Sequence, residues 1–349
     1  MNLLAIDFLE TIYKQEKETS LLGKWIRFKD IKDLFKKFED AFQLAELGTS
    51  EKGIPIYTLK IGSGEKRLLL WSQMHGNEST GTKALFDLFN CLLNSNEIEI
   101  KTILESCTLL FIPMLNPDGA EVYTRVNANN VDLNRDAVDR KAKESNLLRT
   151  TLEEFNPQFC FNLHDQRTIF NVEHTKNPAT ISFLAPSEEE TRALTKGRKE
   201  TMNIIIAMNN MLQEVIPNHV GRYTDEFYPT ATGDNFQKLG FNTILIESGH
   251  YPDDYIREVS RKFTFFSILQ GIYHISKTVN FSSYKAYFSI PNNDKVFYDV
   301  IHRYPNSIND IGYQFKDEII ESKLVSNLVQ MDKTTLKGKF GHREIVFES

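Results

Sequence analysis

The sequence predicts an α/β protein in which helices cover both faces of a mostly parallel sheet. Short apolar runs alternate with helical patterns over roughly 200 residues, which is typical of that architecture. The runs "CTLLFIPM", "QFCFNL" and "NTILIE" are apolar almost throughout, as strands buried on both faces are. From about Tyr284 the pattern changes to short mixed segments. We therefore expect one large three-layer domain followed by a small C-terminal extension.

Each element of this fold follows from a local pattern. Residues 1 to 45 are expected to be helical because apolar residues recur every three or four positions in "LLAIDFLETIY" and "FKDIKDLFKKFEDAF". "IPIYTLKIG" alternates as a strand does, and "GSGEK" is a turn into the strand "RLLLWS". "GTKALFDLFNCLL" is an amphipathic helix with Leu85, Leu88, Phe89 and Leu92 on one face. Further helices are expected at roughly 142–154, 186–216 and 252–277, and "YPNSIND" and "LKGKFGHREIVF" are expected to form turns and edge strands.

These patterns divide the chain into three parts. Residues 1–48 form a helical lead-in, residues 49–284 form the main domain, and residues 285–349 form an extension to which the sequence gives no role. A chain of 349 residues with 41% hydrophobic and 25% charged residues is long enough to bury a substantial core.

The net charge, the N-terminal segment and the cysteines narrow the possible partners and the cellular location. The net charge of -6 argues against a nucleic-acid partner, and no apolar run approaches the ~20 residues that span a membrane. The N-terminal "MNLLAIDFLETIYKQEKE" has no basic lead-in and soon reaches acidic residues, unlike a signal peptide. Cys91, Cys107 and Cys160 each lie in an apolar segment, which favours buried free thiols. We expect a cytoplasmic protein, and no feature of the sequence identifies a protein partner.

Polar residues follow the apolar runs at the points where the strands are expected to end. His75-Gly76-Asn77-Glu78 follows one run, Asn116-Pro117-Asp118-Gly119 a second, His164-Asp165 a third, and Glu247-Ser248-Gly249-His250 a fourth. Ligands of open α/β sheets bind beyond the carboxyl ends of the strands. The coincidence of two histidines and two glutamates at such ends predicts a functional site there.

The types of these residues indicate a metal. Hydrolytic zinc sites commonly use two histidines and one glutamate and keep a fourth position for water. His75 and Glu78 are one turn apart and can reach one ion, and His164 can complete the set from another strand. Taken alone, His75-x-x-Glu78 would more often be a solvated turn, and it is the other strand ends that favour the metal site.

Glu247 and the segment "NPDGAEVYTRVNANNVDLNRDA" supply further candidates. Glu247 either pairs with a nearby basic residue or acts as a general base that takes a proton from metal-activated water. Arg125 and Arg135 suit an anionic target, because one arginine can clamp a carboxylate and another can stabilise an oxyanion. Asp132 could accept a hydrogen bond from a ligand histidine. The alternative is that this segment is a charged surface loop.

Together these residues resemble the zinc carboxypeptidase family, also called funnelins, in a bacterial-type form. The resemblance covers roughly residues 50–275 through H-x-x-E, N-P-D-G, R-x-N-x-x-x-V-D-L-N-R, a strand-end His and a late strand-end Glu. It implies one zinc ion and a mixed eight-stranded sheet with helices on both sides. The deacylases of aspartoacylase and succinylglutamate desuccinylase type are related to this family.

The resemblance also implies a role for each matching residue. His75, Glu78 and His164 would bind zinc, and Asp132 would support the first histidine. Arg125 would polarise the scissile carbonyl, and Glu247 would be the general base and acid. Asn134 and Arg135 would hold the terminal carboxylate of the substrate.

Four departures from the family pattern affect what can be expected. Asn77 precedes the ligand glutamate where animal digestive members have arginine, and the related deacylases share H-G-N-E. Asp136 stands where the peptidases usually have asparagine. The tyrosine that caps the substrate is expected to be Tyr228, with Tyr223 as the alternative. No signal or pro-segment is apparent, which argues against a secreted digestive role.

We therefore expect a zinc metallocarboxypeptidase that cleaves a peptide or peptide-like amide next to a free carboxylate. The first alternative is a zinc-dependent N-acyl amino acid deacylase, which would act on an acylated amino acid with a free carboxylate. The second is a carboxylate-binding protein without turnover. Asp234 or Asn235 could line the pocket of the leaving residue, where Asp234 would favour a basic side chain such as that of diaminopimelate, although "GDNF" could simply turn the chain.

Overall fold

The apolar runs of the sequence form one eight-stranded sheet in the computed structural model, which describes residues 1–305 and 309–347. The strand order is β1-β2-β4-β3-β5-β9-β7-β8. Pairing is parallel between β4 and β3, β3 and β5, β5 and β9, and β7 and β8, and antiparallel at the other three junctions. The mixed eight-stranded sheet is thus confirmed. Its strands are β1 (Gln43–Thr49), β2 (Pro55–Ile61), β3 (Lys66–Trp71), β4 (Cys107–Ile112), β5 (Phe159–Asp165), β7 (Ile181–Leu184), β8 (Val220–Arg222) and β9 (Asn242–Ser248).

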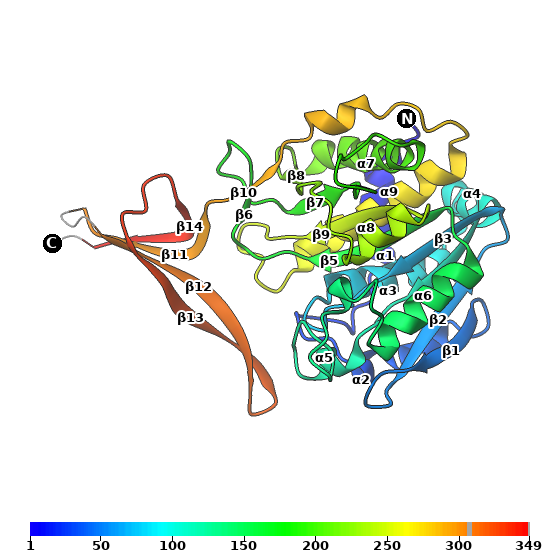
Figure 1. Ribbon diagram of the computed structural model, residues 1–349, viewed down its shortest axis with the longest axis horizontal. Coiled ribbons are helices and arrows are strands. Elements are labelled where there is room, and N and C mark those ends of the chain that lie inside the picture. Colours follow the sequence, from blue (N-terminus) through cyan, green and yellow to red (C-terminus); the bar gives the residue numbers. More distant parts are fainter. Residues whose placement is uncertain (306–308, 348–349) are drawn as a thin grey trace.

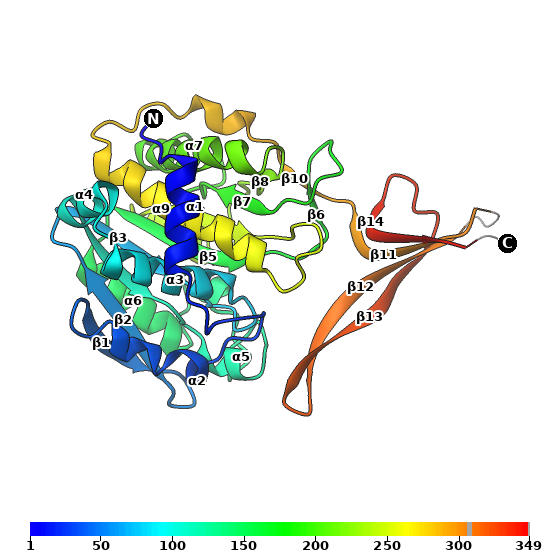
Figure 2. The ribbon, with the colours of Figure 1, turned by 180° about the vertical axis from the view of Figure 1, so that it is seen from behind.

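Helices cover both faces of this sheet and bury a separate core on each. Side chains alternate along β3, so that Leu68 and Leu70 join one core while Leu69 and Trp71 join the other. Figure 2 shows α1, α3 and α9 over the first face, and Figure 1 shows α6 and α8 over the second. The first face is covered by α1 (Ile6–Glu16), α3 (Thr80–Asn94), α4 (Ile98–Ser106), α7 (Lys196–Val215) and α9 (Glu258–Lys277), and the second by α6 (Lys143–Phe155) and α8 (Thr232–Lys238).

Two helices begin later than their sequence patterns predict, because polar side chains cap them. The helix expected from 186 begins at Lys196, where the Thr195 hydroxyl accepts a hydrogen bond from the backbone N–H of Arg198. The helix expected from 252 begins at Glu258, where the Asp254 carboxylate accepts hydrogen bonds from the first three backbone N–H groups of the helix. The helix expected at 142–154 agrees closely with α6.

The expectation that residues 1 to 45 are helical is only partly correct. After α1, the chain forms the four-residue helix α2 (Phe28–Ile31) and the 3-10 helix η1 (Leu34–Lys37), and then enters β1. Phe38 and Phe42 pack edge to face on Phe89 of α3, with ring centroids 5.5 and 5.6 Å apart. We attribute the broken helix to this aromatic packing, which replaces a regular helical face. The boundary expected at residue 48 falls inside β1.

The C-terminal residues form a second sheet beside the main unit (Figure 1). Its order is β13-β12-β11-β14, and the chain reaches it through the 3-10 helix η3 (Lys285–Ser289) and β10, which pairs with β6. The expected turn "YPNSIND" includes residues 306–308, which lie outside the described residues, and "LKGKFGHREIVF" contains β14. The bounds are β6 (Phe170–Val172), β10 (Asn293–Lys295), β11 (Phe297–Arg303), β12 (Asp310–Ile320), β13 (Lys323–Thr334) and β14 (Phe340–Val346).

Two expectations about single features can also be compared with the fold. All three cysteines are buried free thiols, as the sequence predicts. Among the described residues, every helix is too short or too polar to cross a membrane.

Candidate metal and catalytic site

The sheet brings the predicted residues to one edge, at the carboxyl ends of its central strands. His164 and Glu247 are direct register partners on the parallel neighbours β5 and β9, so their side chains lie on the same side of the sheet. His75 and Glu78 lie in the turn between β3 and α3, where the N–H of Glu78 donates to the carbonyl of His75 at 3.0 Å. The structure therefore brings these four residues together where the strand-end reasoning predicts a site.

The tight turn that carries His75 and Glu78 rests directly on another backbone. A Cβ atom at Gly76 would lie 2.0 Å from the carbonyl carbon of Gly119, in α5 (Pro117–Glu121). Asn116 caps α5 by accepting a hydrogen bond from the N–H of Gly119 at 2.8 Å, and its side-chain amide donates to the carbonyl of Met74 at 3.2 Å. The N-P-D-G motif thus supports the loop that holds two of the predicted ligands.

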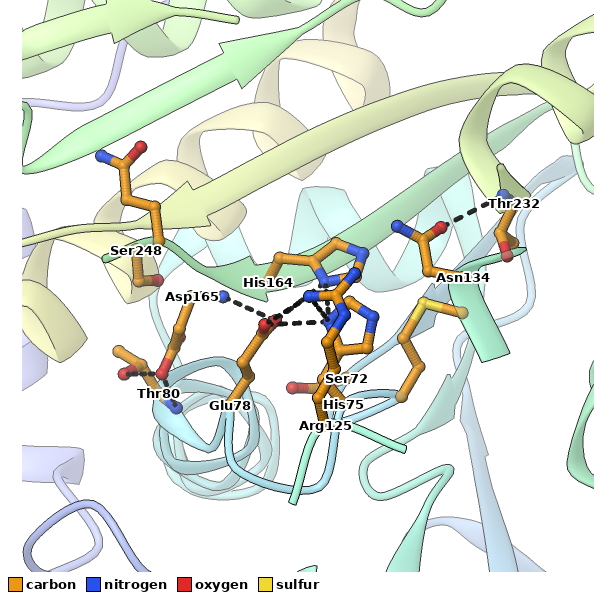
Figure 3. Close-up of polar contacts among 12 residues, drawn as sticks. Ser72, His75, Glu78, Thr80, Arg125, Asn134, His164, Asp165, Thr232 and Ser248 are labelled. Carbon is orange, nitrogen blue, oxygen red and sulfur yellow. Dashed lines mark hydrogen bonds and ion pairs between the residues drawn. The ribbon is translucent and has the colours of Figure 1, made fainter. Parts of the chain in front are cut away.

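His75, Glu78 and His164 converge on one point (Figure 3). The Nδ1 atoms of the two histidines are 3.2 Å apart, and each lies 2.9 Å from one carboxylate oxygen of Glu78. One ligand atom from each residue lies within 4.8 Å of the others. Burial lowers the pKa of His164, which favours the neutral ring that binds a metal. Two imidazole nitrogens and a carboxylate facing one point fit a zinc ion.

Asp132 supports this cluster from behind. One of its carboxylate oxygens lies 3.1 Å from Nε2 of His75, and the other accepts a hydrogen bond from Nε of Arg125 at 2.9 Å. Burial opposes ionisation of Asp132, but the contacts with His75 and Arg125 outweigh it and hold the pKa of this carboxyl below its usual value. An ionised Asp132 orients the His75 ring so that Nδ1 points towards Glu78.

Arg125 and Glu247 are the two candidate catalytic groups, and both face the cluster. A terminal nitrogen of Arg125 lies 3.3 Å from Nδ1 of His75 and 3.5 Å from Glu78. The backbone of Glu247 is paired within the sheet, but no hydrogen bond or ion pair joins its carboxylate to another of the residues 1–305 and 309–347 that the structure describes. Burial and the carboxylates of Glu78 and Asp165 raise the pKa of Glu247 well above its ordinary value. A cation at the cluster would offset the contribution of Glu78, which leaves Glu247 available to exchange a proton.

A cleft of about 450 Å³ runs from the cluster to the candidate carboxylate-binding residues. Asn134 and Arg135 belong to the 3-10 helix η2 (Leu133–Arg135), and both line the cleft. The amide oxygen of Asn134 accepts from the N–H of Thr232 at 3.1 Å, and Figure 3 shows its amide nitrogen on the His164 side. Arg135 donates to the carbonyl of Asn134 at 2.8 Å and is otherwise exposed. The two side chains can offer several N–H donors to an anion.

Both candidate capping tyrosines line the same cleft. Tyr228 is 46% exposed, its hydroxyl donates to Glu226 at 2.9 Å, and its ring lies 6.0 Å from the Arg135 guanidinium. Tyr223 packs on Phe170 with ring centroids 5.2 Å apart, and burial together with the charge of Glu247 raises its pKa. Tyr228 is therefore the more exposed of the two, and the choice between them stays a prediction.

The hydrogen bonds of Asp136 explain its role, whereas those of Asn77 explain its role only in part. Asp136 is buried and accepts hydrogen bonds from the backbone N–H groups of Lys141 and Ala142, both at 2.9 Å, so it shapes the loop before α6. Asn77 is half-buried, and its side-chain oxygen has no hydrogen-bond partner among the described residues. Asp136 therefore has a structural role, whereas Asn77 has an acceptor that is not used.

Two residues of the site were missed in the sequence. The backbone N–H of Asp165 donates to Glu78 at 3.1 Å, and its side chain accepts from the hydroxyl of Thr80 at 2.8 Å, which fixes the ligand loop against β5. Arg257 donates to the carbonyls of Ser248 and Gln166, both at 2.6 Å. The position of Asp165 directly after a ligand is a usable signal, but nothing near Arg257 in the sequence indicates these contacts.

The chain is similar in sequence to known zinc carboxypeptidases. The sequence pattern of the zinc carboxypeptidase family matches residues 29–245. Carboxypeptidase SOL1 of Arabidopsis thaliana is 27% identical over 188 residues, which cover 48% of this chain and 38% of that protein. Carboxypeptidase D of Mus musculus is 23% identical over 192 residues, which cover 47% of this chain and 14% of that protein. The chain thus spans well under half the length of these curated relatives.

Solved structures share the fold. A metallo-carboxypeptidase from Burkholderia cenocepacia has a TM-score of 0.56 and 18% identity, over 70% of this chain and 68% of that one. The carboxypeptidase A from Helicoverpa armigera has a TM-score of 0.56 and 14% identity, over 78% of this chain and 81% of that one.

Proposed function

Because the chain belongs to the zinc carboxypeptidase family, we propose that it is a zinc-dependent carboxypeptidase, which hydrolyses a peptide or peptide-like amide bond next to a free carboxylate. The observation that carries this proposal is the arrangement along one cleft. The converging side chains of His75, Glu78 and His164 line the same cleft as Glu247 and the donors of Asn134 and Arg135.

Each residue has a distinct part in the proposed reaction. Bound by His75, Glu78 and His164, zinc supplies a Lewis acid for the carbonyl and a water of lowered pKa. Glu247 takes a proton from the attacking water and returns it to the leaving amine. Arg125 stabilises the negative charge that develops on the carbonyl oxygen. The bond to be cut is selected by Asn134 and Arg135, which bind the terminal carboxylate through charge-assisted hydrogen bonds.

The central test is the Glu247→Gln variant. Loss of the general base is expected to lower kcat by about 10²- to 10⁴-fold, with bound zinc unchanged. Zinc content and release of C-terminal residues from short peptides are measured together. Glu214→Gln is the matched control, because Glu214 is exposed on α7. Full activity in Glu247→Gln, or activity in metal-free protein, would exclude the mechanism.

The leaving residue is proposed to have a basic side chain. Asp234 lines the cleft, is 5% exposed and accepts a hydrogen bond from the backbone N–H of Tyr228 at 3.2 Å. Asn235 instead accepts a hydrogen bond from Arg149 at 3.3 Å, which favours Asp234 as the pocket residue. A substrate profile that does not change in Asp234→Ala would reject this preference.

A deacylase is the second candidate, and Asn77 is the residue that favours it. Asn77 directly precedes the predicted ligand Glu78, and its buried side-chain oxygen has no hydrogen-bond partner among the described residues, so this oxygen is a candidate acceptor for an acyl-amide N–H. Comparing hydrolysis of N-acyl amino acids with that of short peptides separates the two candidates. Turnover confined to N-acyl amino acids would replace the carboxypeptidase proposal.

A further inference from the structure

A second hollow lies beside the candidate metal site, between the main unit and the C-terminal sheet. Its volume is about 400 Å³. On the inner side it is lined by Asn77 and Glu78, and on the outer side by residues 314–317 of β12. The hollow and the cleft described above share five lining residues: Glu78, Arg125, Asp165, Gln166 and Arg167. The two spaces therefore meet at the predicted reaction centre.

The outer wall of this hollow is attached to the main unit. Thr168, just after β5, donates its hydroxyl to Gln314 at 3.3 Å, and its carbonyl lies 2.8 Å from Nε2 of His342 in β14. Lys24 forms an ion pair with Asp317. The C-terminal sheet is thus held against the loop that follows the ligand His164, and a substrate would meet β12 when it leaves the reaction centre on this side.

The carboxylates that line this hollow already have hydrogen-bond donors. Asp254 caps α9, Asp299 accepts from the N–H of Phe315 at 2.7 Å, and Asp317 is paired with Lys24. Asp165 accepts from the hydroxyl of Thr80. At least one oxygen of each of these carboxylates therefore has a donor from the protein, whereas the second oxygens of Asp165 and Asp299 have no hydrogen-bond partner among the described residues.

Two guanidinium groups in the hollow have no carboxylate in contact. Arg167 is exposed, and no hydrogen bond or ion pair joins it to another residue in the described part of the chain. Within the described residues, the guanidinium of Arg257 donates only to the backbone carbonyls of Gln166, Ser248 and Gly249. The backbone of Arg257 has a φ of 60°. A non-glycine residue in this left-handed conformation is strained. Arg257 thus places a fixed positive charge in the hollow that the exposed Arg167 also lines.

We propose that this hollow binds the acyl-side residue of the substrate and that Arg167, with Arg257 behind it, binds a carboxylate on that residue. The inference rests on the proposed function. A substrate whose terminal carboxylate meets Asn134 and Arg135 has its reacting carbonyl at Glu78 and Arg125, and its acyl portion then points into the second hollow. The substrate class is a short peptide whose acyl-side residue carries an acidic group.

The test measures binding in a form that does not turn over. Zinc-loaded Glu247→Gln protein is titrated by calorimetry with two dipeptides that share a C-terminal residue and begin with glutamate or glutamine. The glutamyl peptide is expected to bind about tenfold more tightly, as one charge-assisted hydrogen-bonded pair allows. Adding Arg167→Ala is expected to remove this preference and to leave the affinity for the glutaminyl peptide unchanged. Arg167→Lys is expected to retain part of the preference, since it keeps the charge without the two-pronged geometry.

Controls separate this inference from the proposed function. Lys101→Ala removes an exposed positive charge on α4 and is expected to keep the full preference. Equal affinities for the two peptides in the Glu247→Gln parent, or a preference that survives Arg167→Ala, would overturn the carboxylate site. Absence of hydrolysis of every peptide by the zinc-loaded wild type would reject the proposed function, while the binding difference would still decide the assignment of Arg167.

Discussion

Asp132 offers a sharp test of how the candidate metal site is held. Its carboxylate contacts Nε2 of His75 at 3.1 Å and Nε of Arg125 at 2.9 Å, and it accepts the backbone N–H of Asn134 at 3.0 Å. Asp132→Ala removes all three contacts and leaves the three predicted ligands themselves unchanged. The His75 ring then loses the partner that fixes its orientation and increases its basicity.

The expected magnitude follows from the role of such a partner. Loss of a carboxylate that supports a ligand histidine typically weakens metal binding 10- to 100-fold, which corresponds to about 1.4 to 2.7 kcal/mol. Arg125 keeps its contacts with His75 and Glu78 but loses the carboxylate that holds its Nε atom. We therefore also expect a lower kcat when zinc is saturating.

The two effects are separated by two measurements. Zinc affinity is measured by competition with a chromogenic chelator, and peptide hydrolysis is measured at saturating zinc. Asp139→Ala is the matched control, because Asp139 lies in the same loop region but its side chain is 59% exposed and pairs with Lys141. An Asp132→Ala protein with wild-type zinc affinity would refute the argument that Asp132 orients His75.

Three further predictions concern stability. Burial raises the pKa of Asp234 to about 6. Above that pH the folded protein therefore carries the cost of a buried ionised carboxylate, whereas below about pH 4 the carboxyl is largely protonated in both the folded and the unfolded protein and the cost disappears. Asp234→Asn should thus raise the free energy of unfolding by about 1 to 3 kcal/mol at pH 8, and a gain that persists unchanged at pH 4 would contradict this cause. Asp87 and Arg261 form an ion pair with both side chains fully buried. Asp87→Ala should therefore lower the free energy of unfolding, measured in urea, by about 3 to 5 kcal/mol, and a decrease of less than about 1 kcal/mol would contradict a stabilising role of this pair. Removing zinc with a chelator should lower the free energy of unfolding by about 4 kcal/mol relative to zinc at 1,000 times its Kd, and an unchanged melting temperature would argue against a bound metal.

The sequence was informative where a single local pattern decides the structure. Apolar runs such as "NTILIE" become buried parallel strands in almost any context, and parallel strands bring their carboxyl ends to one edge. His75, Glu78, His164 and Glu247 could therefore be placed together before the fold was known. The resemblance to a family then supplied the roles of Asn134 and Arg135.

The sequence was less informative where packing between distant segments decides the structure. The apolar spacing of residues 28–45 fits a helix, but the phenylalanines pack on α3 and the chain turns into β1 instead. Arg257 contacts the end of β9 and also Gln166, which follows β5 and lies 91 positions earlier in the chain. The C-terminal sheet consists of short mixed segments whose strand partners cannot be read locally, and its place beside the metal site depends on single contacts such as Thr168 with Gln314.

The contact between Gly76 and Gly119 has a consequence for anyone who wishes to redesign this site. A Cβ atom at Gly76 would collide with the backbone of α5, and one at Gly119 would lie 2.6 Å from both the Asn116 amide and the Val126 carbonyl. The two loops therefore pack as a single structural unit, although more than 40 positions separate them in the sequence. Libraries that vary the H-G-N-E and N-P-D-G segments independently would yield mostly misfolded sites. The segments need to be exchanged between proteins as a matched pair.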